Sequence, residues 1–410
     1  MTNTRVSMMI PVGLFTLAAS IGMVFALLHE LRDAHGLSGG AIGWIAGVSF
    51  FAAVASQLLI APFADRGHAR RVMALSILGG AVAALTFALA SEPWQFVFAR
   101  IAAGLAFGAY LPAAQAVFTA ADPDRAGQHL GRLAGIQTAG FIIGPGIGAG
   151  LVAAWGLDAP FYCLAGALTL LIGPIATIHV DEVVLSEPPL GALRTAADML
   201  ATMARISRRR EALAAAILSA ALIMPAGMYE AIWAIFLQDL GASTTFIGVS
   251  LVLYGLPFMI AAPIGGRLAD RHGPMRIAMA ALAAVIPLTV VYGHLTVPLL
   301  LMSLAMIEGA ANGLGMPSAQ TLMATSTKHG ERATGQGLAA ATGQLAAGVS
   351  ALVAPRLFEN YGPEWTFFWV AVAILVLGTL GFAVGFSGRT RRQTVPIRTF
   401  GLLRIRGGGR

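Results

Sequence analysis

Two glutamates and one arginine lie deep inside long apolar stretches of this sequence. Glu308 lies near the middle of its stretch, Glu230 lies towards the end of another, and Arg100 lies near the start of a third. Ionised side chains are costly in such surroundings, and those that occur there are candidates for substrate sites and proton relays. We therefore expect Glu308 to bind a proton or a substrate, with a structural hydrogen bond to a neighbouring helix as the alternative.

Besides Glu308, five polar side chains in or beside these stretches are candidate site residues. Glu230 is a second candidate for the proton, and Arg100 is either a counter-charge or a packing residue. The amides of Asn312, Gln115 and Gln320 could line a polar cavity or form hydrogen bonds between helices. A group of charged residues at 30–33, where the first apolar stretch ends, has the composition of a solvated rim.

Other kinds of chemistry have no residues to support them in the sequence. The single cysteine, Cys163, excludes a disulfide and a cysteine metal site, and no set of His, Asp and Glu has ligand spacing. Since no glycine-rich phosphate loop is present either, we expect no nucleotide, metal or other cofactor. Charged residues make up 11% of the chain, too few to cover a soluble globule of 410 residues. That excludes a soluble enzyme and a nucleic-acid-binding protein.

The elements that must position these residues are apolar stretches long enough to cross a bilayer. About 20 helical residues cover a hydrocarbon core of about 30 Å, and twelve stretches reach that length. They lie near residues 7–28, 40–61, 72–90, 94–118, 132–154, 159–179, 212–236, 244–264, 277–294, 297–323, 333–354 and 365–386. The sequence thus predicts an all-α membrane protein with twelve transmembrane helices, the first of which is no cleaved signal peptide.

The basic residues indicate which side of the membrane each segment faces. With the N-terminus inside, 23 of the 26 Lys and Arg residues fall in cytoplasmic segments; Arg32 and Arg356 fall outside, and Arg100 lies within a span. By the positive-inside rule we expect both termini to be cytoplasmic, and we expect the protein in the cell (inner) membrane. We expect the polar linker 181–211 to carry a surface helix, and both it and the arginine-rich tail 387–410 to lie on anionic lipid headgroups.

An internal repeat divides the twelve spans into two sets of six. A shift of 205 residues superposes eight landmarks without a gap, among them Gly43 on Gly248 and Pro112 on Pro317. Duplicated bundles with a central site between them are typical of secondary transporters. We therefore predict two pseudo-symmetric six-helix bundles, with these segments: N-terminal bundle 1–180, cytoplasmic linker 181–211, C-terminal bundle 212–386 and basic tail 387–410.

Each half carries a motif of one acid among arginines between its second and third spans. The first copy contains Asp65, Arg66, Arg70 and Arg71, and the second contains Gly266, Asp270, Arg271, Gly273 and Arg276. Glycine allows a tight turn, and an acid among arginines can form an ion pair that breaks and reforms. We expect a gate at the cytoplasmic face, with a topology signal and a tight turn as the alternative.

In these two motifs the sequence resembles the major facilitator superfamily, over nearly its whole length (6–386). The second copy fits that family's loop signature, Gly-x-Leu-Ala-Asp-Arg-x-Gly, at every position up to the basic end, whereas the first copy departs from it at three positions. The resemblance implies the major facilitator fold. It also implies that Asp65 and Asp270 steady the state that is closed towards the cytoplasm.

The fifth span carries small residues spaced to form one flat helix face. They are Gly131, Gly140, Gly144, Pro145 and Gly148. Glycines four apart allow close backbone approach and the proline bends the helix, so plain helix packing would explain the pattern. The spacing also resembles the antiporter signature of exporters in the superfamily, from which it departs only at Ala149.

The resemblance to the drug:proton antiporter branch implies a proton-coupled secondary active exporter and not an enzyme. It implies multidrug-type efflux of small, lipophilic or cationic molecules by alternating access, with a carboxylate protonated from outside and deprotonated inside. The expected partners of this monomer are its substrate, protons and lipid. An exporter of an endogenous metabolite such as a sugar, siderophore or lipid is the alternative; an uptake symporter and a non-transporting membrane sensor are less favoured.

Overall fold

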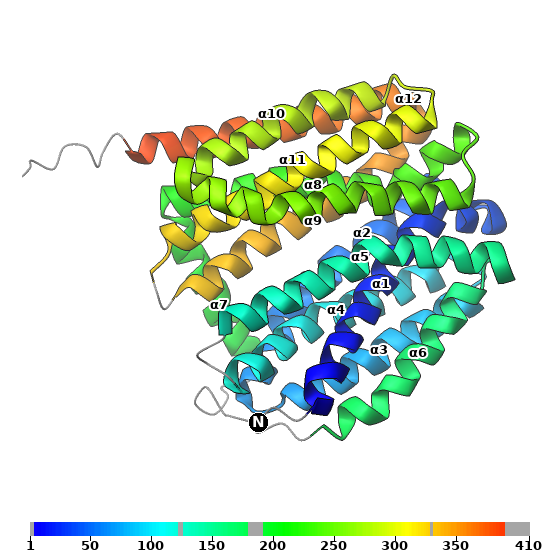
Figure 1. The fold of residues 1–410 in the computed structure, drawn as a ribbon, viewed down its shortest axis with the longest axis horizontal. Helices are drawn as coiled ribbons and strands as arrows, with labels where there is room; N and C mark the ends of the chain where they lie inside the picture. Colours follow the sequence, from blue (N-terminus) through cyan, green and yellow to red (C-terminus); the bar gives the residue numbers. More distant parts are fainter. Residues whose placement is uncertain (1–3, 122–125, 179–191, 329–330, 390–410) are drawn as a thin grey trace, which may run out of the picture.

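A computed structural model describes residues 4–121, 126–178, 192–328 and 331–389, and the elements in these ranges are all helical. The helices are α1 (Thr4–His35), α2 (Gly39–Leu59), η1 (Ala61–Arg66), α3 (Ala69–Leu89), α4 (Pro93–Ala121), α5 (Ala126–Trp155), α6 (Ala159–Ala176), α7 (Ala192–Ser207), α8 (Arg210–Asp239), α9 (Thr244–His272), α10 (Pro274–Tyr292), α11 (Pro298–Ser326) and α12 (Arg332–Arg389). Within the described residues, eleven helices are long and apolar enough to cross a membrane. They run side by side along the molecule (Figure 1).

The last helix, α12, contains two of the predicted spans. It is 58 residues long, and Gly362 interrupts it with a φ of 78°. Glycine takes this left-handed conformation readily, and Pro363 directly after it suits the first position of a new helix. The two parts of α12 together are long enough to cross a bilayer twice. The predicted all-α fold with twelve spans is therefore confirmed, with the last two spans joined in one bent helix.

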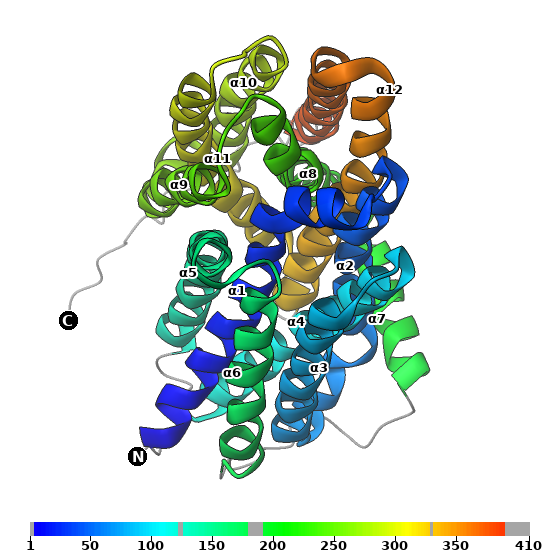
Figure 2. The same ribbon diagram turned by 90° about the vertical axis from the view of Figure 1, so that its right-hand side faces the viewer.

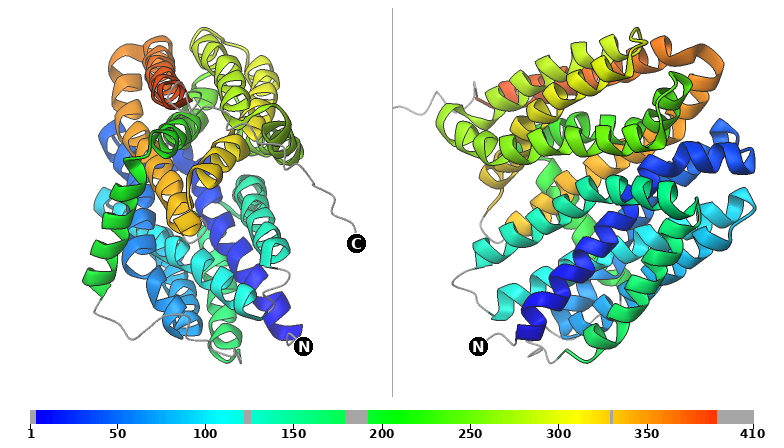
Figure 3. Two further views of the ribbon diagram at one scale, coloured as in Figure 1. Left: turned by 90° about the vertical axis from the view of Figure 1, so that its left-hand side faces the viewer. Right: turned by 45° about the vertical axis from the view of Figure 1, so that its right-hand side comes forward.

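The spans form two bundles of six. Helices α1–α6 make the N-terminal half and α8–α12 the C-terminal half, which lie one below the other in Figure 2 and in both views of Figure 3. In the first half α1 packs on α5, and α3 packs on α4 and α6; in the second half α8 packs on α12, and α9 packs on α11. The helix α7 contacts α2 and η1 of one half and α8 and α12 of the other.

The two ends of the molecule differ in what they carry. The start of α1, the end of α12 and α7 lie at one end, here called the α7 end; the opposite end, where α1 turns into α2, is the α1–α2 end (Figure 1). Large exposed aromatic side chains mark the α1–α2 end, namely Trp44, Trp94, Trp155, Tyr361 and Trp365. Because Trp and Tyr favour the boundary between hydrocarbon and headgroups, these residues mark the membrane surface there.

The glycines of α5 bring this helix close to α1. A Cβ added at Gly140, Gly144 or Gly148 would lie within 2.7 Å of an atom of α1, such as the carbonyl oxygen of Ala19 at 2.5 Å from the position built on Gly144. A Cβ at Gly131 would meet nothing within 4 Å. The flat face predicted for the fifth span therefore begins at Gly140 and packs inside its own half.

The acid-and-arginine motifs differ in structure between the two halves. In the second copy α9 continues through Asp270 to His272 and ends at Gly273, whose φ is 91°. In the first copy α2 ends at Leu59 and is followed by the 3-10 helix η1, which ends at Gly67 with a φ of 81°. In the 205-residue repeat, Gly67 lies one position before the equivalent of Gly273. The expected turn is thus a single glycine in each copy, and Asp270 lies on a helix.

The linker and the tail are described only in part. The part of the linker that is described contains one helix, α7, whose side chains Ala196, Met203 and Ile206 are buried; its expected place on the membrane surface stays a prediction. Residues 179–191 and 390–410 lie outside the described residues. The domain boundaries at 180, 211 and 386 and the contact of linker and tail with headgroups stay predictions.

Candidate functional site

The carboxyl group of Glu308 is enclosed by tyrosine hydroxyls from two other helices. The glutamate lies in the middle of α11 and is 1% exposed. The hydroxyl of Tyr229 on α8 lies 2.8 and 2.9 Å from its two oxygens, and that of Tyr292 on α10 donates to Oε2 at 2.8 Å. A carboxyl with donors on both oxygens is stabilised despite its burial.

A second layer of polar and aromatic groups surrounds this carboxyl. Asn312, one turn further along α11, donates to the hydroxyl of Tyr254 at 3.0 Å and lies 3.5 Å from Oε1 of Glu308. The ring of Tyr229 packs edge-on against those of Tyr254 and Tyr292, at centroid distances of 6.4 and 6.3 Å. All five residues belong to the C-terminal half, and we call them the Glu308 cluster.

Arg100 and Glu230 form an ion pair that joins the two halves. Arg100 lies on α4 and Glu230 on α8, and their side chains are 0% and 2% exposed. The guanidinium also donates to the carbonyl oxygen of Ile45 at 2.9 Å and to Oγ of Ser49 at 2.8 Å, both on α2. Arg100 is thereby fixed to its own half and pairs with Glu230, not with Glu308.

Further hydrogen bonds join the halves between this ion pair and the α1–α2 end. On one side lie His29, Glu30, Arg32, Asp33 and Gly39; on the other lie Gln238, Asp239, Thr244 and Glu359. Arg32, for example, donates to Gln238 at 3.3 Å and to Asp239 at 3.4 Å. The charged residues expected to form a solvated rim thus lie on a seam between the halves.

Two glycines bring the halves into close contact further from the α1–α2 end than this seam. A Cβ added at Gly43 on α2 would lie 2.7 Å from the carbonyl oxygen of Leu352 on α12. A Cβ added at Gly248 on α9 would lie 2.6 Å from Cβ of Ala149 and 3.1 Å from the carbonyl oxygen of Pro145, both on α5. Gly43 and Gly248 are equivalent positions of the 205-residue repeat. The halves are therefore in close contact in two places, between α2 and α12 and between α9 and α5.

At the α7 end the acid-and-arginine motif of the second half is exposed. Asp270, Arg271 and Arg276 are exposed, and none of the ion pairs between described residues includes Asp270. In the first copy, Arg70 is half-buried and Arg71 exposed, whereas the side chains of Asp65 and Arg66 lie outside the described residues.

The remaining amides are not part of the Glu308 cluster. Gln115 is half-buried on α4. Gln320 is exposed on α11, and its carbonyl oxygen accepts a hydrogen bond from Gln336 at 2.8 Å. Of the candidate site residues, the structure therefore brings together Glu308 with Asn312, and Arg100 with Glu230.

The tyrosines of the Glu308 cluster were not predicted as site residues from the sequence. The chain has six tyrosines, of which three lie in apolar stretches of the second half, at positions 229, 254 and 292. Scarcity of a polar aromatic residue in an apolar chain, together with the position of Tyr229 beside Glu230, is a signal that could have found them.

Comparison with known proteins agrees with this architecture. The profile of the Major Facilitator Superfamily matches residues 12–231 and 212–404. The chain is 28% identical over 336 residues to the multidrug resistance protein MdtG of Enterobacter lignolyticus and 26% identical over 322 residues to that of Klebsiella pneumoniae, with 76% of each chain covered in both cases.

Solved structures share the fold at low sequence identity. The nucleoside transporter NupG superposes with a TM-score of 0.75 at 15% identity, covering 92% of this chain and 98% of that one. A bacterial homologue of the human lysosomal transporter Spinster, in an inward-facing and unoccupied conformation, gives 0.76 at 13% identity, covering 95% and 99%. With its two bundles, its acid-and-arginine motifs and its family profile in agreement, this chain belongs to the major facilitator superfamily of membrane transporters.

Proposed function

We propose that this protein is a proton-coupled exporter of small, lipophilic or cationic molecules that works by alternating access. The similarity to MdtG proteins, whose name refers to multidrug resistance, supports efflux. The observation that carries the proposal is the buried ion pair between Arg100 and Glu230. It provides one ionisable link between the halves, beside a second buried carboxyl, Glu308, inside one half.

The α1–α2 end is the outer side in this proposal, and the described conformation is closed there and faces inward. The hydrogen bonds between the halves at this end support closure, as does one apolar core that includes Leu27 and Ile45 of the first half with Ile232 and Phe236 of the second. The exposed Asp270 agrees with this, because a latch that steadies the inside-closed state has no role in an inward-facing one.

Glu308 is the site of proton and substrate exchange in the proposed cycle. A substrate that enters from the inner side competes for the carboxylate and for its tyrosine donors, and the proton leaves towards the cytoplasm. After the protein opens outwards, a proton from that side neutralises Glu308 and weakens its hold on a cationic substrate. Because the substrate and the proton replace each other at Glu308 on opposite sides of the membrane, export of the substrate is coupled to entry of the proton.

Arg100 and Glu230 act as the outer lock of the same cycle. While both are charged they hold α4 to α8, and separation would leave two charges in a medium of low polarity. Tyr229 precedes Glu230 on α8, so a substrate that displaces the Tyr229 hydroxyl from Glu308 also moves the lock. Opening on the outer side then follows occupancy of the site.

Proteoliposomes with the purified protein test the proposal directly. We expect a lipophilic cation such as tetraphenylphosphonium to drive proton movement in the opposite direction, seen with a pH-sensitive dye inside the vesicles. The Glu308→Gln variant should abolish this movement, and Glu364→Gln, an exposed glutamate on α12, is the matched control. A cation that moves without protons in the wild type would contradict proton coupling.

A polar endogenous metabolite is the second candidate substrate. The observation that favours it is the density of hydrogen-bonding groups at the site, where two tyrosine hydroxyls donate to one carboxyl and Asn312 donates to a third hydroxyl beside it. Competition in inverted vesicles separates the two. Each competitor is tested for the concentration at which it blocks uptake of the labelled lipophilic cation. If sugars or nucleosides block uptake at lower concentrations than other lipophilic cations do, the result favours the metabolite.

A further inference from the structure

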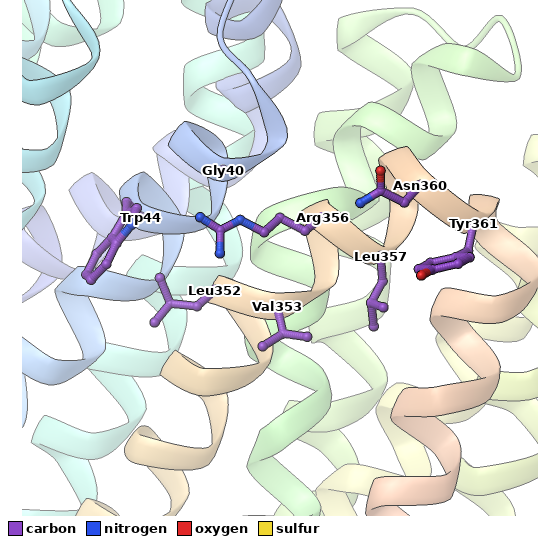
Figure 4. Close-up of a pocket in the computed structure, with 8 residues that line it drawn as sticks. All are labelled: Gly40, Trp44, Leu352, Val353, Arg356, Leu357, Asn360 and Tyr361. Carbon is purple, nitrogen blue, oxygen red and sulfur yellow. The ribbon is translucent and has the colours of Figure 1, made fainter.

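A pocket of about 440 Å³ opens at the α1–α2 end, where α2 of one half meets α12 of the other. In Figure 4 the Arg356 side chain extends from α12 towards Gly40 and Trp44 of α2, and Asn360 and Tyr361 lie on its other side. Apolar side chains of α12, among them Leu352 and Val353, line the part further from this end. The pocket is thus polar towards the end of the molecule and apolar along the span.

Arg356 has no counter-charge in the described part of the chain. The sequence places two arginines at this end, and the first, Arg32, pairs with Asp33 and Asp239. No ion pair between described residues includes Arg356, which is exposed. Glu359, one turn along the same helix, instead accepts a hydrogen bond from the backbone nitrogen of Gly39. The guanidinium is therefore available to an anion.

The pocket lies at the level where lipid headgroups meet the protein. Trp44 and Tyr361, which line it, are 48% and 65% exposed and belong to the aromatic side chains that mark the membrane surface. Val353, one turn from Arg356 towards the centre of the span, is also 48% exposed. A ligand that fills the pocket therefore has a charged part at Arg356 and an apolar part against α12.

We propose that this pocket binds a phospholipid, with the phosphate on Arg356 and an acyl chain along Leu352 and Val353. A guanidinium pairs with two phosphate oxygens at once, and the Asn360 amide, on the other side of the Arg356 side chain, offers a further donor in the pocket. The preferred lipid carries net negative charge, such as phosphatidylglycerol, because the pocket offers one cation and no acid among its lining residues.

The bound lipid joins the two halves. Arg356 lies on α12, and a Cβ added at Gly40 on α2 would lie 3.4 Å from its Nε and Nη2 atoms, so the guanidinium rests directly on the other half. A phosphate on Arg356 and an acyl chain in the groove between α2 and α12 would have to leave when these helices separate. The lipid therefore stabilises the conformation that is closed at the α1–α2 end, whatever the transported substrate.

Native mass spectrometry of the purified protein with phosphatidylglycerol or phosphatidylcholine tests the proposal without a transport assay. We expect the wild type to retain phosphatidylglycerol, and Arg356→Gln to bind it about fivefold more weakly, the ratio expected for one arginine at an anionic surface. Arg356→Lys keeps the charge and should retain most of the binding. Arg132→Gln, an exposed arginine on α5, is the control for loss of charge elsewhere.

Melting temperatures in nanodiscs of the two lipids provide the second measurement. Phosphatidylglycerol should raise the melting temperature of the wild type and of Arg132→Gln more than that of Arg356→Gln, while all three agree in phosphatidylcholine. Equal affinity of the wild type and Arg356→Gln for phosphatidylglycerol would overturn the proposal. So would equal stabilisation of the wild type by inorganic phosphate, since that would remove the need for an acyl chain.

Discussion

Tyr229 and Glu230 are successive residues of α8, and their side chains bond to partners in different halves of the molecule. The Tyr229 hydroxyl donates to Glu308 within the C-terminal half, whereas Glu230 accepts from Arg100 of the N-terminal half. Successive side chains of a helix point about 100° apart, so one helix can contact both groups. A rotation or shift of α8 changes both contacts together, which is the physical basis of the coupling proposed above.

The Glu308→Gln variant should separate substrate exchange from proton coupling. Glutamine keeps the size of the side chain and can still bond to Tyr229 and Tyr292, as acceptor through its oxygen and as donor through its amide nitrogen, but it cannot take up a proton. Exchange of labelled substrate across the vesicle membrane should persist, while accumulation of substrate against a gradient is lost. Normal uphill pumping by Glu308→Gln, together with failure of Glu230→Gln, would assign the proton to Glu230.

The Arg100–Glu230 pair should behave as a unit. Replacement of one partner leaves the other charge buried and unpaired, and should cost about 3–5 kcal/mol, whereas replacement of both by leucine should cost far less. Thermal unfolding of Glu230→Leu, Arg100→Leu and the double variant measures this in a double-mutant cycle. Losses that simply add in the double variant would show that the two side chains act independently.

A side chain at Gly43 should force the halves apart at the α1–α2 end. The Cβ of Gly43→Ala would meet the carbonyl oxygen of Leu352 at 2.7 Å, too close for any real contact, whereas Gly150→Ala on α5 meets nothing within 4 Å. Spin labels on Glu92 and Glu364, in a variant without the native cysteine, report the separation of the halves. We expect longer distances for Gly43→Ala alone; an unchanged distribution would mean that this contact does not hold the end closed.

The two gate motifs should differ in their sensitivity to loss of the acid. Because the second copy is the intact one, Asp270→Asn should impair transport more than Asp65→Asn at equal expression. Asp270 is exposed in the described conformation, so the defect should appear in transport rate and not in the melting temperature. Wild-type activity of Asp270→Asn would reduce the motif to a topology signal.

The topology itself predicts a one-sided sensitivity to proteases. If both termini are cytoplasmic, a protease should cut the 181–211 linker in inverted vesicles and leave it intact in whole cells. The same experiment on vesicles of both orientations checks that the linker is accessible at all. Cleavage in intact cells would reverse the assignment of the α1–α2 end as the outer side.

The helices could be predicted because their signals are local in the sequence. Long apolar stretches, their flanking charges and the 205-residue repeat led to twelve spans in two bundles, and even the bend of α12 lies at a Gly-Pro pair between two predicted spans. Boundaries moved where helices continue beyond the apolar stretch, as α9 does through Asp270.

The contacts of the site depend on how helices face one another, which spacing alone does not determine. The sequence marks Glu308, Glu230 and Arg100 as costly residues, but their partners on other helices lie between 16 and 130 residues away. Nothing local indicates that Glu230 pairs with Arg100 while Glu308 is held by tyrosines. The seam from His29 to Glu359 could not be predicted from the sequence for the same reason, since it depends on the contact of two whole bundles.

The glycine contacts at Gly43 and Gly248 also bear on the origin of the protein. The helices α2 and α9 are the second spans of their halves, and α5 and the first part of α12 are the fifth, so the two contacts are one self-complementary interface made twice. Before the duplication, a single six-helix subunit with this interface would have formed a two-fold symmetric dimer. Fusion into one chain allowed the two copies of the interface to diverge. Gly47 faces Gly348 in one copy, whereas Val252, the equivalent of Gly47 in the 205-residue repeat, faces Gly146 in the other.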